Sequence, residues 1–359
     1  MHDFLVIGGG VIGMTTAREL ALNGFSVALF DKGELGREAS WAAGGILSSM
    51  RPWVEHPASA ALSNAGKRDY QAFTESLKAD TGIDPEYIKC GLFMAGKDDI
   101  KHTLDWARQN AVNWSQGKAQ IPQSLVLHDD TILLPDIAQV RPSRLVRALA
   151  ADLRARKVDV FEHMPVSGMS ISNGRFHSVT AGNDEFPAGA AIVCAGAWSA
   201  TLLQQLGIAI DVKPVCGQML CMHLPGMRLK QIVLDGGHYL IPRADDHFLV
   251  GSSMEHTGFR KDTTAETRQK LLEWAHKTWP DSREAVLVDH WAGLRPGSDA
   301  GHPYIGKIPG LDGIYFNTAH FRKGVLQAVP SARLLLDYLL KKQSFIDIEA
   351  YQPKSETQK

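Results

Sequence analysis

Residues 3–13, DFLVIGGGVIG, decide the fold of this chain. An apolar run leads into a G-x-G-x-x-G pattern made by Gly8, Gly10 and Gly13, and apolar residues at helical spacing follow it. In such a fingerprint the first glycine permits a tight turn, the second lets a pyrophosphate approach the backbone, and the third lets the helix pack against the strand. The N–H groups at the start of the helix then point toward the phosphates. The stretch therefore predicts the first strand and helix of a dinucleotide-binding fold.

A second apolar run, residues 25–30, follows the predicted helix and ends at Asp31. This is about where an acidic residue meets the ribose hydroxyls of a bound dinucleotide. A glycine fingerprint alone is a weak signal, because glycine-rich turns are common. Here strand, glycines, helix, second strand and acid occur in the expected order, so a dinucleotide site is favoured over a simple turn.

The composition is that of an ordinary globular protein. The 359 residues allow two lobes and a large core, since 44% of them are hydrophobic and 21% are charged. A net charge of −1 gives no sign of binding to nucleic acid or to an anionic membrane. The four cysteines form no C-x-x-C pair, which argues against a zinc cluster or a disulfide framework.

The same features bear on location. No apolar stretch reaches the length of a membrane span, and the N-terminal apolar run of about five residues is too short for a signal peptide. We therefore expect a cytoplasmic protein with reduced thiols and without stable membrane insertion.

The predicted secondary structure alternates between helices and strands. Helices are expected where apolar residues recur at helical spacing, over residues 58–80, 98–110, 144–156 and 324–340. Ser143 is the expected N-cap of the third helix, and Pro330 is compatible with the fourth only in its first turn. Strands are expected over residues 92–95, 158–161, 166–171, 176–181, 213–222, 237–242 and 248–252.

The predicted nucleotide-binding domain is interrupted. After Asp31 the chain does not continue with another strand–helix unit, and a buried parallel-strand pattern returns only at residues 190–196. We expect an α/β protein (α+β overall), with a discontinuous Rossmann-like domain and a substrate domain built on a mainly antiparallel sheet. The expected divisions are residues 1–50, 140–210 and 291–350 for the first domain, 51–139 and 211–290 for the second, and 352–359 for a polar tail.

Three segments together resemble the D-amino-acid oxidase superfamily of flavoenzymes, and within it the bacterial glycine oxidases of thiamine biosynthesis. The first is the N-terminal fingerprint with ASWAAGGI at 39–46, and the second is IVCAGAWS at 192–199. The third and most specific runs from WAGLRPG at 291–297 through HPYIG at 302–306 to HFRKGV at 320–325. The resemblance spans nearly the whole chain.

The resemblance implies FAD as cofactor, with the adenosine at residues 8–31 and the isoalloxazine between the two lobes. Sarcosine-oxidase relatives attach the flavin through a cysteine late in the chain, and no cysteine follows Cys221 here, so non-covalent FAD is expected. The expected cofactor-binding residues are Gly8, Gly10, Val11, Ile12, Gly13, Asp31, Lys32, Ser40, Ala43, Gly44, Gly45, Val166, Ala195, Gly196, Trp198, Arg322, Lys323, Gly324, Val325 and Leu326.

Four residues are candidates for the substrate site, each with a plainer alternative. Arg295 lies at the end of an apolar strand, where its charge needs an anionic partner. The resemblance implies that this partner is the α-carboxylate of a substrate, and the alternative is a carboxylate of the chain itself in an internal salt bridge. Tyr239 is a second donor to that carboxylate or a packing residue. Met254 contacts the substrate or lies in the core, and Arg322 holds substrate or flavin or forms a surface ion pair.

Lys323 is a departure from the resemblance, because family members usually carry asparagine there. It precedes the predicted helix 324–340, whose N-terminus the family turns toward the pyrimidine end of the flavin. Its ammonium either adds a positive charge near the flavin or extends into solvent and changes nothing.

The activity implied by the resemblance is oxidative deamination of glycine and other small amines, such as sarcosine and small D-amino acids. The products would be the imine or 2-oxo acid, ammonia and hydrogen peroxide, and the expected partners are a small amino acid, dioxygen and further copies of the chain in a tetramer. Three alternatives stay open: an FAD-dependent D-amino-acid dehydrogenase that passes electrons to a quinone, the flavin domain of a tRNA-modifying enzyme, and a non-enzymatic dinucleotide sensor. The near-neutral charge argues against the tRNA enzyme.

Overall fold

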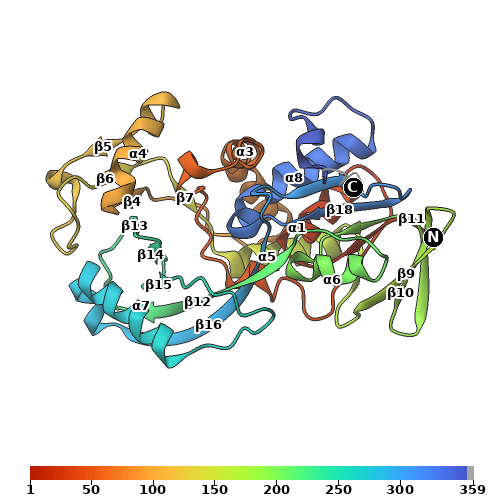
Figure 1. Ribbon diagram of the computed structural model, residues 1–359. Helices are drawn as coiled ribbons and strands as arrows, with labels where there is room; N and C mark the ends of the chain where they lie inside the picture. Colours follow the sequence, from red (N-terminus) through yellow and green to blue (C-terminus); the bar gives the residue numbers. More distant parts are fainter. Residues whose placement is uncertain (354–359) are drawn as a thin grey trace.

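Two eight-stranded sheets form the frame of the protein, and Figure 1 displays them on the two sides of a computed structural model that describes residues 1–353. The expected α/β fold is confirmed. Of the predicted polar tail at 352–359, residues 354–359 lie outside the described residues. Among the described residues, no helix is both long enough and apolar enough to cross a membrane.

The first sheet has a parallel centre. Its main strands, in spatial order, are β17 (Tyr304–Lys307), β18 (Ile314–Thr318), β11 (Asp184–Val193), β1 (His2–Ile7), β2 (Val27–Phe30) and β8 (Asp159–Phe161). Only β17 runs antiparallel to its neighbour, and the hairpin of β9 (Val166–Ser172) and β10 (Arg175–Ala181) continues from β11. The central strands are apolar on both sides because both faces of the sheet are covered.

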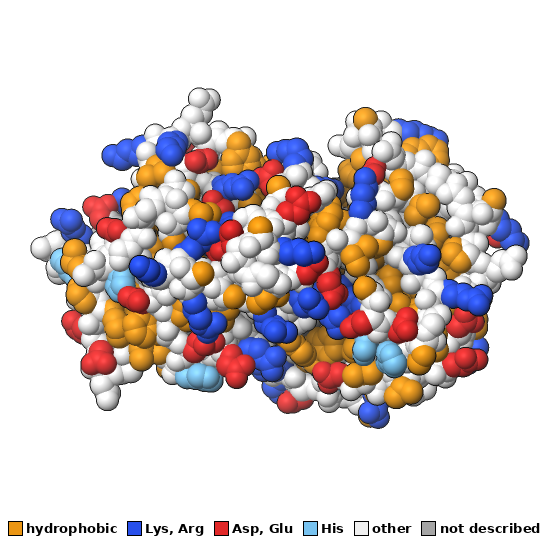
Figure 2. All heavy atoms as spheres, turned by 180° about the vertical axis from the view of Figure 1, so that it is seen from behind, with side chains coloured by type: hydrophobic (Ala, Val, Ile, Leu, Met, Phe, Trp, Pro, Cys, Tyr) orange, Lys and Arg blue, Asp and Glu red, His pale blue; other side chains and the backbone are white. Residues whose placement is uncertain are grey.

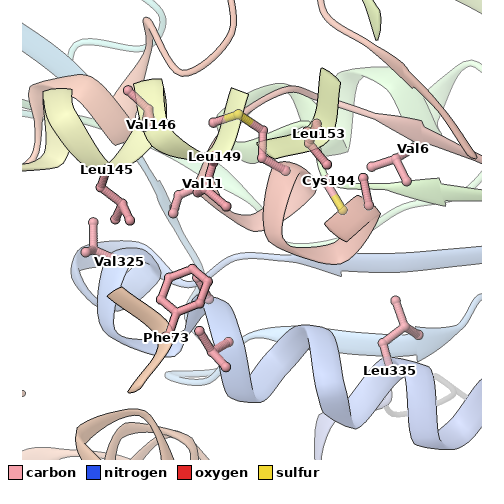
Figure 3. Packing of buried hydrophobic residues seen from close by; sticks show 14 of the residues in the cluster. Val6, Val11, Phe73, Leu145, Val146, Leu149, Leu153, Cys194, Val325 and Leu335 are labelled. Atoms are coloured by element: carbon pink, nitrogen blue, oxygen red, sulfur yellow. The ribbon is translucent and has the colours of Figure 1, made fainter. Parts of the chain in front are cut away.

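Helices cover one face of this sheet. They are α1 (Val11–Leu22), α3 (Pro57–Thr81), α5 (Pro142–Ala155) and α8 (Gly324–Leu339). Figure 3 shows Val11 of α1, Phe73 of α3, Leu149 of α5 and Val325 of α8 meeting in this core. The opposite face lies against the β9–β10 hairpin and α6 (Ser199–Gln204).

The second sheet is mainly antiparallel. Its strands, in spatial order, are β16 (Val286–Gly297), β12 (Lys213–His223), β15 (His247–Gly251), β14 (His238–Pro242), β13 (Ile232–Asp235), β4 (Leu92–Met94), β6 (Ile132–Leu134) and β5 (Ser115–Gln116). Successive residues alternate between two cores: Tyr239 and Ile241 enter one, while Leu240 enters the other beneath α7 (Ala265–Thr278). Only β13 and β4 pair in parallel.

The long strands β12 and β16 carry the second sheet to the edge of the first. They pair along almost their whole length, and the far end of β16 contacts the 3₁₀ turns η3 (Gly196–Trp198) and η5 (Phe321–Lys323). The remaining short elements are α2 (Ala39–Ala42), α4 (Lys97–Gln109), β3 (Ile88–Lys89), β7 (Ala138–Gln139), η1 (Pro52–Val54), η2 (Lys118–Gln120), η4 (Pro280–Glu284) and η6 (Ile348–Tyr351).

Two details of the predicted helices are wrong. Helix α5 begins at Pro142, with Arg141 as its N-cap, so Ser143 lies inside the helix. Proline is favourable at the first position of a helix, because the N–H group that it lacks would have no partner within the helix. Pro330 lies beyond the first turn of α8, where it cannot donate to the carbonyl of Leu326. Helix α3 packs closely at this point, since a Cβ on Gly66 would lie 2.1 Å from the Leu326 carbonyl oxygen.

The strands of the two sheets alternate along the chain. Those of the first sheet come from three separate stretches, and strands of the second sheet lie between them. The domain boundaries at residues 50, 140, 210 and 291 stay a prediction.

Candidate active site

Two adjoining cavities lie where β1, β2, β11 and β18 end. They have about 1090 and 980 Å³ of empty volume and share Gly10, Ser40 and Gly196 in their walls. The carboxyl ends of parallel strands are where α/β proteins bind their ligands. The cavities therefore form one cleft, which runs from the glycine-rich loop toward the second sheet.

The three glycines of the fingerprint have distinct surroundings. Gly8 has a φ of +112°, and a Cβ there would lie 2.4 Å from the carbonyl oxygen of Cys194. A Cβ on Gly13 would lie 1.8 Å from the carbonyl oxygen of Gly8, so this glycine allows the contact between helix and strand. Gly10 caps α1 without a side chain and faces the cleft. The Val11 N–H donates to the Ser40 hydroxyl (2.8 Å), and the N-terminus of the helix faces the cleft, where its dipole favours an anionic ligand.

Asp31 ties the glycine loop to the end of β2. Its carboxylate accepts hydrogen bonds from the N–H groups of Gly9 (2.6 Å) and Gly33 (2.8 Å). Burial raises the pKa of Asp31, although both hydrogen bonds act against this. The residue lines the second cavity, beside Lys32, whose ammonium lies 3.2 Å from the ring centroid of Trp198. Contact of Asp31 with a ribose stays a prediction.

Most of the predicted cofactor residues line the cleft, and three do not. Gly13 faces Gly8 instead, and the side chain of Leu326 is in the hydrophobic core, 1% exposed. Lys323 forms an ion pair away from the walls. The Leu326 side chain packs in the core between α8, α1 and α3, so its predicted contact with the cofactor stays a prediction that only the backbone could fulfil. The predicted residues in the walls are Gly8, Gly10, Val11, Ile12, Asp31, Lys32, Ser40, Ala43, Gly44, Gly45, Val166, Ala195, Gly196, Trp198, Arg322, Gly324 and Val325.

Arg295 lies in the first cavity, near the end of β16. Its guanidinium donates to the Ser252 hydroxyl (2.9 Å) and to the carbonyls of Cys216 (3.2 Å) and Ser253 (3.3 Å). A Cβ on Gly217 would lie 2.1 Å from both terminal nitrogens, so this glycine makes room for the guanidinium. No carboxylate within residues 1–353 pairs with Arg295, which excludes the internal salt bridge as the alternative.

Tyr239 comes from β14, which is separated from β16 by β12 and β15, and lines the same cavity. The side chain is buried, and its hydroxyl donates a 3.6 Å hydrogen bond to the sulfur of Met219. A Cβ on Gly251 would lie 2.5 Å from the ring, so that glycine admits it. A thioether is a weak acceptor, which leaves the hydroxyl available to a stronger one.

Arg322 lies in the same wall, on η5. It forms no hydrogen bond or ion pair with the described part of the chain, so the predicted surface ion pair is wrong. Desolvation in the cleft lowers its pKa, and the positive charges of Arg295 and Arg51 act in the same direction, while the Tyr239 hydroxyl opposes them.

Met254 is placed outside the site. The side chain is 61% exposed and lines neither cavity, so both the substrate contact and the core position predicted for it are wrong. Its neighbours explain this orientation. Ser253 turns inward to the Gln218 N–H (2.9 Å), and Glu255 accepts from the Gln218 side chain (2.9 Å), so the residue between them points outward.

Lys323 is part of a buried polar group. Its ammonium lies 2.8 Å from the carboxylate of Glu55, whose side chain is 2% exposed, and 3.1 Å from the Ser59 hydroxyl. Burial acts to raise the pKa of Glu55, but the charge of Lys323 and hydrogen bonds from it and from serines hold that pKa below its usual value. The alternative in which the ammonium extends into solvent is therefore wrong.

Two residues at the cleft are not among the predicted site residues. Arg243 is buried and donates to the carbonyls of Gly44 (2.8 Å) and Val140 (3.0 Å), so it holds the glycine pair of the cleft wall. His320 lines the first cavity, and its buried Nε2 has no partner among residues 1–353. Burial lowers the pKa of His320 to about 3. Arg243 lies outside every motif, and His320 belongs to the HFRKGV stretch, but the burial and contacts of both residues depend on segments far apart in the chain.

Comparisons with known proteins agree on one family. The model of the family described as FAD dependent oxidoreductase matches residues 3–338. The chain is 40% identical to the glycine oxidase of Pseudomonas aeruginosa, over 97% of this chain and 98% of that protein. It is 39% identical to the glycine oxidase of Pseudomonas putida, over 98% of each. Among solved structures, the glycine oxidase of Geobacillus kaustophilus is similar with a TM-score of 0.93 and 26% identity, covering 99% of both chains.

Proposed function

This chain belongs to the family of FAD-dependent oxidoreductases, and we propose that it oxidises glycine and other small amino acids. Sarcosine and small D-amino acids are included, because one methylene changes binding by only about 1–3 kcal/mol. The observation that carries the proposal is the setting of Arg295. The guanidinium has only neutral partners in the cleft, so its charge is left for the carboxylate of a substrate.

FAD is the cofactor of this family, and the cleft fits it in shape and chemistry. The N-terminus of α1 at Gly10 suits a pyrophosphate, and the two cavities suit the two halves of a dinucleotide. We assign the adenosine to the cavity with Asp31 and Val166 and the isoalloxazine to the cavity with Gly44 and Gly324. Bound FAD supplies the acceptor for two electrons.

The chain's own residues bind and orient the substrate. The planar fork of Arg295 pairs with the α-carboxylate, and the Tyr239 hydroxyl adds a further hydrogen bond. Fixing the carboxylate fixes the α-carbon beside it, which removes much of the entropic cost of the reaction. The substrate amine reacts in its neutral form, because its lone pair assists the loss of hydride from the α-carbon. Water takes the amine proton, so no side chain has to act as a general base.

The finer steps belong to the same proposal. Water hydrolyses the imine to a 2-oxo acid and ammonia, dioxygen accepts the electrons and becomes hydrogen peroxide, and the imine serves thiamine thiazole synthesis. We also propose non-covalent FAD, a homotetramer and a cytoplasmic location. On the face in Figure 2, Lys and Arg side chains are interspersed with Asp and Glu, which favours a small substrate over RNA on that side.

Anaerobic titration of the flavin-loaded protein with glycine, sarcosine and D-alanine tests the proposal. We expect the flavin absorbance to bleach and to return with peroxide formation when air is admitted. Bleaching that recovers only with a quinone would favour a dehydrogenase. A flavin that stays oxidised with every amino acid would overturn the assignment.

A further inference from the structure

The side chain of Lys323 lies outside the cavity walls, in a buried polar group around Glu55. Its ammonium is 2.8 Å from Glu55 Oε1, and the same oxygen accepts hydrogen bonds from the hydroxyls of Ser59 and Ser63, each at 2.8 Å. The side chain of Glu55 is only 2% exposed, and that of Lys323 is 18% exposed. One carboxylate oxygen therefore takes three donors in a place with little access for water.

This polar group lies where the N-terminal parts of α3 and α8 pack together. The Gln327 amide of α8 donates to the hydroxyls of Ser59 (2.9 Å) and Ser63 (3.0 Å) on α3. A Cβ on Gly66 would lie 2.1 Å from the carbonyl oxygen of Leu326, so the two helices are in close contact beside the polar group. The packing of the helices therefore fixes the carboxylate relative to the start of α8.

The carboxylate of Glu55 faces two cations. Its closest partner is Lys323, and the second is Lys67 of α3, whose ammonium lies 5.5 Å from the ring centroid of Trp106. Burial lowers the pKa of Lys67, while the charge of Glu55 acts to raise it, so these two groups are within electrostatic reach. An ionised carboxylate in contact with an ammonium cancels most of the field that either charge alone would produce at a distance.

The ion pair lies directly behind the wall of the cavity to which we assign the isoalloxazine. Lys323 is the N-cap of α8 and stands between Arg322 and Gly324, which both line that cavity. Reduced flavin carries a negative charge that oxidised flavin lacks, so any net charge close to the cavity changes the balance between the two forms. A buried charge acts strongly here, because water and salt screen it less than a surface charge.

We propose that Glu55 sets the reduction potential of the bound flavin by neutralising the ammonium of Lys323 beside the isoalloxazine cavity. Glu55 lines neither cavity and acts through Lys323, so it is a positioning residue rather than a catalytic one. Family members usually carry asparagine at the position of Lys323, and the ion pair allows a lysine there without added net charge. The inference rests on the proposed function, which supplies the flavin.

The two partners of the pair give opposite results when each is removed alone. Glu55→Gln leaves the positive charge of Lys323 unbalanced and is expected to favour reduced flavin about tenfold, which raises the two-electron midpoint potential by about 30 mV. Lys323→Asn leaves the negative charge of Glu55 and lowers the potential by a similar amount. The variant with both changes has the net charge of the wild type, so its potential returns toward the wild-type value.

Anaerobic reduction of the holoenzymes with dithionite in the presence of a reference dye measures the potentials. Titration with sulfite gives a second readout, because the flavin–sulfite adduct is also negatively charged, and its affinity changes in the same direction as the potential. The matched controls are Lys342→Asn and Glu349→Gln, since both residues are exposed and line neither cavity. We expect wild-type potentials for both controls.

A pair with only a structural role would shift the potential in the same direction in both single variants, or in neither, and each of these results overturns the inference. An unpaired buried charge destabilises a protein, so Glu55→Gln can lose its flavin. In that case Lys323→Asn is compared with the double variant, which must restore the potential.

Reduction by dithionite needs no substrate and therefore separates this inference from the proposed function. If glycine bleaches the flavin while Glu55→Gln and Lys323→Asn keep the wild-type potential, the proposed function stands and the role of Glu55 fails. If no amino acid bleaches the flavin, the proposed oxidation fails, and opposite shifts in the two variants still support the role of Glu55.

Discussion

In the proposed function, the single residue Arg295 makes the cleft selective for anions. Its guanidinium is held by one hydroxyl and two carbonyls, which orient it without neutralising it. A charge held in this way is costly in the empty cleft, and a substrate carboxylate relieves that cost. The proposed preference for an anion thus depends both on the neutral groups that orient the Arg295 guanidinium and on the lack of a carboxylate beside it among the described residues.

Replacing Arg295 by alanine is expected to leave FAD bound and to weaken every α-amino acid substrate. Truncation of one partner of a desolvated charge pair costs about 2–5 kcal/mol, which lowers kcat/KM by a factor between roughly thirty and several thousand. Arg295→Lys restores only part of the loss, because an ammonium lacks the bidentate fork. Steady-state kinetics with glycine measure the effect. A near-normal kcat/KM for Arg295→Ala would assign the clamp to another residue.

His320 gives a prediction about pH and stability. Its pKa is lowered from 6.5 to about 3 by burial, so below pH 6.5 the unfolded chain binds a proton that the folded protein refuses. The contribution of His320 to stability is therefore fully present above pH 6.5 and declines by about 1.4 kcal/mol per pH unit as the pH falls toward 3.

Urea unfolding at pH 7 and pH 5 measures this decline. We expect His320→Gln to lose less stability between the two pH values than the wild type does, by about 2 kcal/mol. The comparison cancels other groups that titrate in the same range. An equal loss in both proteins would mean that His320 is protonated in the folded state.

At the scale of elements, the pairing of β12 with β16 builds the proposed substrate site. Gly217 on β12 lies opposite Gly293 on β16, and Arg295 follows two residues later on the same strand. The absence of a side chain at Gly217 creates the space that the guanidinium occupies. The register of two strands, rather than a loop, thus determines where the positive charge lies.

Gly217→Ala should move the guanidinium, because the new methyl group would lie 2.1 Å from two of its nitrogens. We expect a raised KM for glycine with normal FAD content and an unchanged fold. The matched control is Gly168→Ala on β9, where a methyl group would make only an ordinary contact 3.8 Å from Thr180. Kinetics and flavin absorbance of the two variants decide the matter, and equal KM values would contradict this role of Gly217.

At the scale of the whole molecule, two sheets meet at one cleft. The first contributes the ends of its parallel strands and the N-terminus of α1, while the second contributes Arg295 and Tyr239. The residues proposed to bind the dinucleotide and the substrate therefore come from separate sheets, which lie side by side in Figure 1. The residues of both sheets line one cavity.

The manner of cofactor binding is a property of the whole chain. No cysteine follows Cys221, and Cys194, which does line the cleft, is 4% exposed with its pKa raised to about 12 by burial. A thiol that stays protonated is a poor nucleophile, so we expect no bond to the flavin. Acid precipitation should release all of the yellow colour into the supernatant as FAD. Colour retained in the washed pellet would contradict this expectation.

The sequence by itself determined the features that depend on neighbouring residues. The spacing of Gly8, Gly10 and Gly13 after an apolar run predicted the first strand, turn and helix, because glycine conformation and side-chain periodicity are local. Arg295 stood out for the same reason, as a charge at the end of an apolar strand. The resemblance then supplied the family.

Only the tertiary structure decided which partners these residues have. Lys323 pairs with Glu55, 268 residues away, and Arg243 donates to the carbonyl of Gly44, 199 residues away. Met254 points to solvent because inward hydrogen bonds claim both of its neighbours. Such contacts lie outside any sequence window, since burial and pairing depend on how distant segments pack. The same holds for Arg322, which lies in the wall of the first cavity and has no hydrogen-bond or ion-pair partner among residues 1–353.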